Sequence, residues 1–90
     1  MMFTLGQITV SPGAKVCLGL GESEVLLNRH VQGDYGDIPL VDQCINDQCV
    51  VEGGPITSIY RSRKGFEVVI VTKNGQTTIN LVGERYVCSK

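Results

Sequence analysis

The chemistry that this sequence could perform centres on its single histidine. His30 is followed by two aspartates, Asp34 and Asp37, with Gly33 and Gly36 between them. A histidine whose pKa lies near neutral pH, placed beside carboxylates, can act as a general base or share a ligand set with them. One hypothesis is therefore a small hydrolase or metal-dependent enzyme with His30, Asp34 and Asp37 as its catalytic residues.

The same residues also have an interpretation in which they only join elements of the fold. His30 would lie on the same side of a helix as two leucines, where an imidazole bonds to the backbone or to a carboxylate. Asp34 would bond local amides, Tyr35 would fill the space beneath the turn, and Asp37 would cap the next helix. We favour this interpretation, because the sequence shows no nucleophile with an adjoining base, no phosphate-binding glycine loop and no zinc motif.

A basic cluster offers a different chemistry. Arg61, Arg63 and Lys64 lie between Tyr60 and Phe66, and cations can contact phosphates while aromatic rings stack on bases. The alternative is a hydrophilic loop between two strands. The isoelectric point of about 5.7 argues against binding to a nucleic acid. We therefore keep nucleic-acid binding through these residues only as a third hypothesis.

Local sequence signals predict three helices followed by three strands, and these elements would position both the histidine cluster and the basic cluster. Helices are expected to begin near Ser11, Ser23 and Asp37 and to end near Gly19, Gly33 and Gly53. Strands are expected at residues 56–60, 66–72 and 76–82, and the Asn74-Gly75 pair predicts a type I′ hairpin between the last two. Residues 8–10 also have strand composition. The predicted fold class is α+β, in one domain over residues 1–90: two or three short N-terminal helices packed on a C-terminal three-stranded antiparallel β-meander.

The third predicted helix is expected to be amphipathic. Its apolar residues recur at steps of three and four and would face the sheet: Val41, Cys44, Ile45, Cys49 and Val51. Its polar residues would then face solvent and form an acidic outer surface: Asp42, Asn46, Asp47 and Glu52.

Composition narrows the class of protein. Residues 1–54 hold two basic and seven acidic side chains, whereas residues 55–90 hold six basic and two acidic ones, so the surface is dipolar. No apolar run approaches the length of about 20 residues that crosses a bilayer, and the N-terminus does not resemble a secretory signal. We expect a cytoplasmic protein without a cofactor or bound metal. Its four cysteines lack a CxxC pair and are expected to be free thiols.

The order of these features resembles a family of small uncharacterised bacterial proteins carried on plasmids, integrative elements and prophage-like regions. The resemblance runs from Phe3 to Tyr86 and is sharpest at residues 27–37, where the family typically shows Leu-Leu-x-Arg-His-x-x-Gly-Asp-Trp-Gly and this chain has Tyr35 in place of tryptophan. The matching positions are Leu27, Arg29, His30, Gly33, Asp34, Gly36, Asp42, Asn46, Gly53, Gly54 and Thr78. The resemblance implies a mobile-element setting, in which compact anti-restriction and anti-CRISPR proteins block host complexes by surface contact.

The leading functional hypothesis is a non-enzymatic accessory protein of a mobile element that binds another protein, such as a host defence complex. Its binding surface would be formed by the turn after the second helix and by the third helix: Arg29, His30, Asp34, Tyr35, Asp37, Asp42 and Asn46. The identity of the partner and the oligomeric state do not follow from the sequence.

Overall fold

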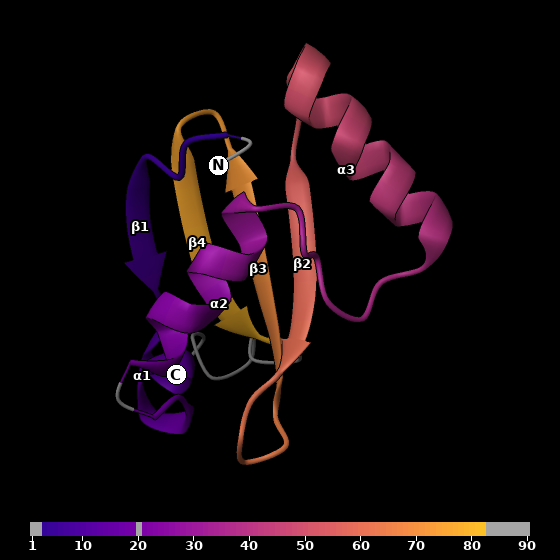
Figure 1. Ribbon diagram of the computed structural model, residues 1–90. Helices are drawn as coiled ribbons and strands as arrows, with labels where there is room; N and C mark the ends of the chain where they lie inside the picture. Colours follow the sequence, from indigo (N-terminus) through magenta and orange to yellow (C-terminus); the bar gives the residue numbers. More distant parts are fainter. Residues whose placement is uncertain (1–2, 20, 83–90) are drawn as a thin grey trace.

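The predicted antiparallel meander is present. In the computed structural model, which describes residues 3–19 and 21–82, β2 (Ile56–Arg61), β3 (Glu67–Lys73) and β4 (Gln76–Leu81) pair in series (Figure 1). Lys73 pairs with Gln76 across the turn, in which Asn74 and Gly75 have φ angles of 52° and 74°. Two consecutive positive φ angles define the type I′ turn that an Asn-Gly pair favours. The hairpin prediction is therefore confirmed.

The sheet contains a fourth strand that the predicted three-stranded meander lacked. β1 (Gln7–Val10) pairs in parallel with β4, so the strand order is β1-β4-β3-β2 and the sheet is mixed. Strand composition was visible at residues 8–10, but the partner of β1 is distant in the sequence and no local signal specifies it. Gly6, at φ 65°, makes the approach possible, because a Cβ there would lie 2.0 Å from the Gly75 carbonyl oxygen.

In the described part of the chain, three helices accompany the sheet in this α+β fold: α1 (Pro12–Cys17), α2 (Glu22–Val31) and α3 (Leu40–Glu52). The start of α1 is as predicted, because Ser11 accepts a hydrogen bond from the Ala14 amide at 3.1 Å and Pro12 takes the first helical position. The glycine after α3 is also confirmed as its C-terminal cap.

Ser23 and Asp37 are not the helix N-caps that the sequence predicted. Ser23 lies inside α2, which begins one residue earlier after Gly21; the Glu22 carboxylate accepts the Gly19 amide at 2.9 Å. Asp37 does not cap α3, which begins at Leu40 after Pro39. The Asp37 amide instead donates to the Ile59 carbonyl oxygen at 2.7 Å, so this segment is committed to β2.

The core lies between α2 and one face of the sheet (Figure 1). Alternate strand residues point to this face, as the two-residue period requires. The buried apolar cluster consists of Ala14, Leu26, Tyr60, Val68, Ile70 and Ile79. On the opposite face the corresponding residues of β2 and β3 are only half-buried: Thr57, Ile59, Val69 and Val71.

α3 occupies a different position from α2. It lies beyond β2, along the edge of the sheet (Figure 1). Within residues 3–19 and 21–82, no helix is long and apolar enough to cross a membrane.

Candidate functional site

His30 is fully buried between α2 and the sheet, with no exposed surface. Its Nδ1 lies 2.5 Å from the Ser58 hydroxyl oxygen, and its Nε2 lies 2.9 Å from the Thr72 hydroxyl oxygen. The ring of Phe3 meets the imidazole edge-on at 5.1 Å between centroids. Burial lowers the pKa of His30 to about 4, so the imidazole is neutral at neutral pH.

The direction of each hydrogen bond around His30 follows from a neighbouring carbonyl. The Thr77 hydroxyl donates to the Leu5 carbonyl oxygen at 2.6 Å and therefore accepts from Thr72, whose hydroxyl lies 2.7 Å away. Thr72 has then used its proton and must accept from His30 Nε2–H. His30 Nδ1 is left as an acceptor, and Ser58 donates to it. The histidine thus links α2 to three strands and to the N-terminal segment.

Arg29 and Asp34 form an ion pair at the end of α2. Arg29 Nε donates to Asp34 Oδ2 at 2.8 Å, and Arg29 Nη2 donates to Asp34 Oδ1 at 3.2 Å. The guanidinium also lies 4.7 Å above the centre of the Tyr60 ring. Hydrogen bonding to Arg29 lowers the pKa of Asp34, and the same bond raises the pKa of Arg29. Both side chains are partly exposed but are already engaged with each other.

The segment after this pair runs along the outer edge of β2. The Tyr35 carbonyl oxygen accepts from the Ile59 amide, and the Asp37 amide returns a bond to the Ile59 carbonyl oxygen. Gly36, at φ 75°, sits so close that a Cβ would lie 2.1 Å from that carbonyl oxygen. The buried Tyr35 hydroxyl donates to Asp47 of α3 at 3.2 Å, and burial raises the pKa of Tyr35 to about 12. These contacts tie the turn and α3 to the sheet.

The three residues of the enzyme hypothesis are not brought together. His30 is enclosed by hydroxyl groups, the Asp34 carboxylate faces Arg29, and Asp37 is exposed. No group of three or more His, Cys, Asp or Glu side chains within the described part of the chain could hold a metal ion. The geometry therefore provides no open pocket in which this histidine and these carboxylates could act on a substrate.

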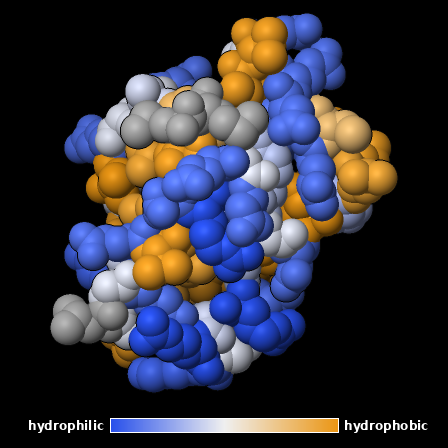
Figure 2. Space-filling view, in the orientation of Figure 1, coloured by the Kyte–Doolittle hydropathy of each residue, from blue (hydrophilic) through white to orange (hydrophobic). Residues whose placement is uncertain are grey.

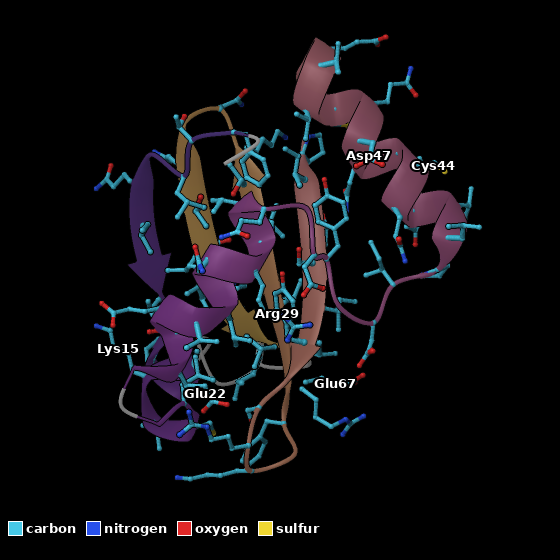
Figure 3. All side chains as sticks on the ribbon, in the orientation of Figure 1. Lys15, Glu22, Arg29, Cys44, Asp47 and Glu67 are labelled. Carbon is cyan, nitrogen blue, oxygen red and sulfur yellow. The ribbon has the colours of Figure 1, made fainter. Side chains whose placement is uncertain are left out.

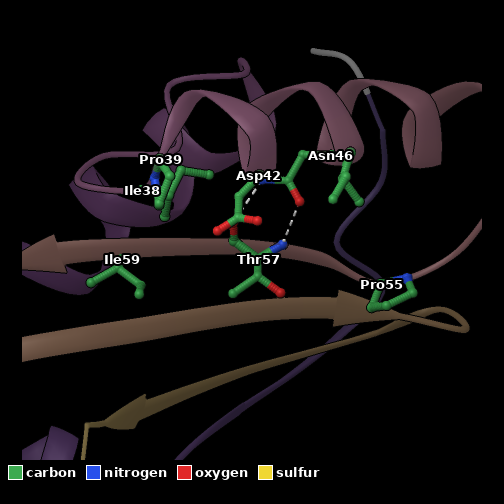
Figure 4. Close-up of a pocket in the computed structure, with 8 residues that line it drawn as sticks. Ile38, Pro39, Asp42, Asn46, Pro55, Thr57 and Ile59 are labelled. Atoms are coloured by element: carbon green, nitrogen blue, oxygen red, sulfur yellow. Dashed lines mark hydrogen bonds between the residues drawn. The ribbon is translucent and has the colours of Figure 1, made fainter.

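The side chain of Asn46, on α3, also forms hydrogen bonds within the domain. Its side-chain Nδ2 donates to the Thr57 carbonyl oxygen at 2.7 Å, and its Oδ1 accepts from the Thr57 amide at 3.1 Å (Figure 4). One side-chain amide thereby supplies both hydrogen bonds that a neighbouring strand would otherwise give to this residue of β2. Asn46 is the buried residue of α3.

This bond reverses the predicted orientation of α3. At 3.6 residues per turn, turning Asn46 toward β2 places most of the predicted core positions on the opposite side. Leu40, Val41, Ile45 and Val51 are 74, 64, 51 and 84% exposed, and Cys44 is exposed as well. The predicted apolar inner side is therefore wrong, and so is the expected exposure of Asn46, whereas Asp42, Asp47 and Glu52 are exposed as predicted. We call these five outward residues the α3 apolar face. Figure 2 shows apolar surface at the top and at the right edge of the molecule, over the two ends of α3, with hydrophilic surface between these areas.

A pocket of about 340 Å³ lies between α3 and β2. Its lining includes Asp42 and Asn46 together with Ile45, which also belongs to the α3 apolar face. The other lining residues are Ile38, Pro39, Pro55, Thr57 and Ile59 (Figure 4). Asp42 and Asn46 are thus the two sequence-predicted binding residues that the structure places at one concave site.

The basic loop between β2 and β3 forms some hydrogen bonds within the domain. Arg61 donates to the Gly65 carbonyl oxygen at 3.0 Å, and the Arg63 amide donates to Glu22 at 2.7 Å. Figure 3 shows Glu22 at the start of α2, near this loop. The hydrogen bond from Gly19 is the main cause that lowers the pKa of Glu22, and it keeps a buried negative charge beside Arg63 and Lys64. Arg63 and Lys64 are nevertheless exposed, and nucleic-acid binding through this loop stays a prediction.

A comparison with known proteins finds no family model, no curated sequence and no solved structure that matches this chain. Among the described cysteines, Cys17, Cys44 and Cys49 are free thiols, and Cys88 lies outside the described residues.

The sequence interpretation missed the α3 apolar face as a candidate site. Apolar residues occur on nearly every side of this helix, including Val50 and Leu40, so their period did not specify which side is buried. The signal that could have found the orientation is Asn46, an amide centred in the helix and able to bond the edge of a strand.

Proposed function

We propose that this protein is a non-enzymatic binding module that holds another protein against the α3 apolar face. The observation that carries the proposal is the inverted orientation of α3, which turns Asn46 toward the sheet and valine, leucine and isoleucine side chains toward solvent. A helix normally buries its apolar side against its own domain. An apolar surface on the outer side of a helix is typical of a protein interface.

Contacts within the domain support this assignment by elimination. Polar side chains of the motif that carries the resemblance already form hydrogen bonds within the domain. His30 bonds to two hydroxyl groups, Arg29 bonds to Asp34, and Tyr35 bonds to Asp47. The α3 apolar face has no such partner among the described residues, and removing one of its valines from water would favour binding by about 1 to 2 kcal/mol. Binding energy is therefore available at α3 rather than at the histidine.

The mobile-element resemblance suggests the partner to test first. A cytoplasmic accessory protein of a plasmid or prophage would gain from blocking a host defence complex, such as a restriction or CRISPR assembly. Surface blocking needs shape and apolar contact but no catalytic group, which agrees with the enclosed His30.

The experiment uses two exposed valines as a matched pair. Val51 lies on α3 and is 84% exposed, whereas Val16 lies on α1 and is 78% exposed. Purified wild type, Val51→Ser and Val16→Ser are immobilised, and proteins retained from lysates of bacteria with restriction and CRISPR systems are quantified. We expect a partner that Val51→Ser loses and Val16→Ser retains. A partner lost equally from both variants, or retained by both, would refute binding through α3.

A further inference from the structure

The two edges of the sheet differ in whether their outward main-chain groups have hydrogen-bond partners within the described residues. The outer edge of β2 is covered, since Asn46 bonds both main-chain groups of Thr57 and the segment at Tyr35 and Asp37 bonds both main-chain groups of Ile59. Covering an edge in this way prevents it from pairing with another chain. β1 forms the other edge and lies at the outer left of the sheet (Figure 1).

The outward main-chain groups of β1 belong to Ile8 and Val10. The Gln7 amide donates to the Gly75 carbonyl oxygen at 3.1 Å, and the Ser11 amide donates to the Ile79 carbonyl oxygen at 2.9 Å. Because main-chain groups alternate along a strand, those of Ile8 and Val10 point away from β4. No helix or strand in residues 3–19 and 21–82 pairs with this side.

β1 is a short strand of four residues, but it carries neither a charged side chain nor a proline. Protective edges carry charged side chains or proline within the strand. No charged residue occurs from Phe3 to Ala14, and Pro12 follows the strand rather than interrupting it. The Ile8 side chain is 43% exposed. Two copies of this neutral segment can approach each other without like-charge repulsion.

We propose that β1 pairs with β1 of a second copy of this chain, in antiparallel orientation about a two-fold axis at Thr9. Ile8 of one copy then lies opposite Val10 of the partner, and about four main-chain hydrogen bonds join the two sheets into one. Thr9, whose own amide faces β4, lies directly opposite its equivalent. The dimer leaves α3 free, and its existence does not depend on the proposed function.

The acidic character of α3 argues against the other two-fold arrangement. α3 exposes three acidic residues, Asp42, Asp47 and Glu52, and contains no basic residue. Packing α3 against a second α3 would bring these carboxylates together, whereas the β1 pairing brings no charges together.

The first test measures the mass of the protein in solution. Sedimentation velocity over a range of concentrations is expected to give a dimer that dissociates on dilution. Ile8→Pro removes an amide that points away from β4, so the fold keeps its internal hydrogen bonds while the dimer is lost; Ile8→Val is the matched control and keeps the dimer. Wild type that is monomeric at every concentration, or a dimer that persists in folded Ile8→Pro, overturns the proposal.

A charge swap tests the register and does not depend on how the proline variant folds. Thr9 is exposed, so Thr9→Lys and Thr9→Glu should both fold. Each variant alone places like charges opposite one another and is expected to weaken the dimer about fivefold at low salt, and an equimolar mixture should restore it. Gln76→Lys adds the same charge on the exposed start of β4 and should leave the dimer unchanged. A mixture that associates no better than either variant alone overturns the two-fold axis at Thr9.

Discussion

The buried neutral His30 makes the stability of this protein depend on pH in a specific window. Burial lowers its pKa to about 4, whereas an unfolded histidine titrates near 6.5. Between these values the unfolded chain binds a proton that the folded chain does not, so the free energy of unfolding rises as pH increases from about 4 to about 6.5. The whole interval corresponds to about 3 kcal/mol, of which about 2 kcal/mol is lost between pH 7 and pH 5.

Above pH 5, the effect of His30 on stability can be distinguished from the effects of Asp34 and Glu22. Hydrogen bonds lower the pKa of both Asp34 and Glu22, so the stability they contribute is lost only as pH falls below the ordinary carboxyl range. Urea unfolding followed by circular dichroism at pH 7, 6 and 5, at one protein concentration, measures the effect. His30→Gln keeps a polar side chain without an ionisable group, and its free energy of unfolding should be nearly constant over this range. A wild type as insensitive to pH as His30→Gln would refute the account of a buried neutral imidazole.

Three further predictions concern the contacts that position α3 and the turn before it. Asn46→Ala removes both side-chain bonds to Thr57 and should lower the free energy of unfolding by about 2 kcal/mol; a loss below about 0.5 kcal/mol in urea unfolding would show that this amide does not hold α3. Gly36→Ala should be far more damaging than Gly75→Ala, because the two glycines have φ angles of 75° and 74° but only Gly36 has a carbonyl oxygen 2.1 Å from the added Cβ. Thermal melting of the two alanine variants compares them directly, and equal melting temperatures would contradict the close approach. Arg29→Ala removes a partly exposed ion pair and should cost only about 1 kcal/mol by the same urea assay, so a loss of several kcal/mol would point to a larger role for its contact with the core.

The meander was predictable because its determinants are local. The Asn74-Gly75 turn and the alternation along β2 and β4 specify the hairpins within a few residues of sequence. β3 was expected to be central because its apolar residues occupy both faces, and Val68 and Ile70 are indeed fully buried. The pairing of β1 with β4 joins opposite ends of the described chain, and the close approach at Gly6 that permits it is visible only in three dimensions.

The orientation of α3 was not predictable from periodicity, because hydrogen bonding rather than apolar burial decides it. The outer edge of β2 presents main-chain groups that lose free energy if they are buried without partners. Asn46 can bond both groups of Thr57, and no apolar residue of α3 can do so. The helix therefore turns its amide inward and leaves apolar side chains in solvent, which is the opposite of what apolar burial alone favours.

Internal hydrogen bonding also accounts for most of the polar side chains in the most distinctive segment of the sequence. Between residues 29 and 37, Arg29 bonds Asp34, His30 bonds Ser58 and Thr72, and Tyr35 bonds Asp47, whereas Asp37 is exposed. Such a motif constrains how α2, the turn and β2 meet, so proteins that share it would share this junction whatever they bind. Under the proposed function, differences in binding would arise at the α3 apolar face, and substitutions there should change the partner without changing the fold.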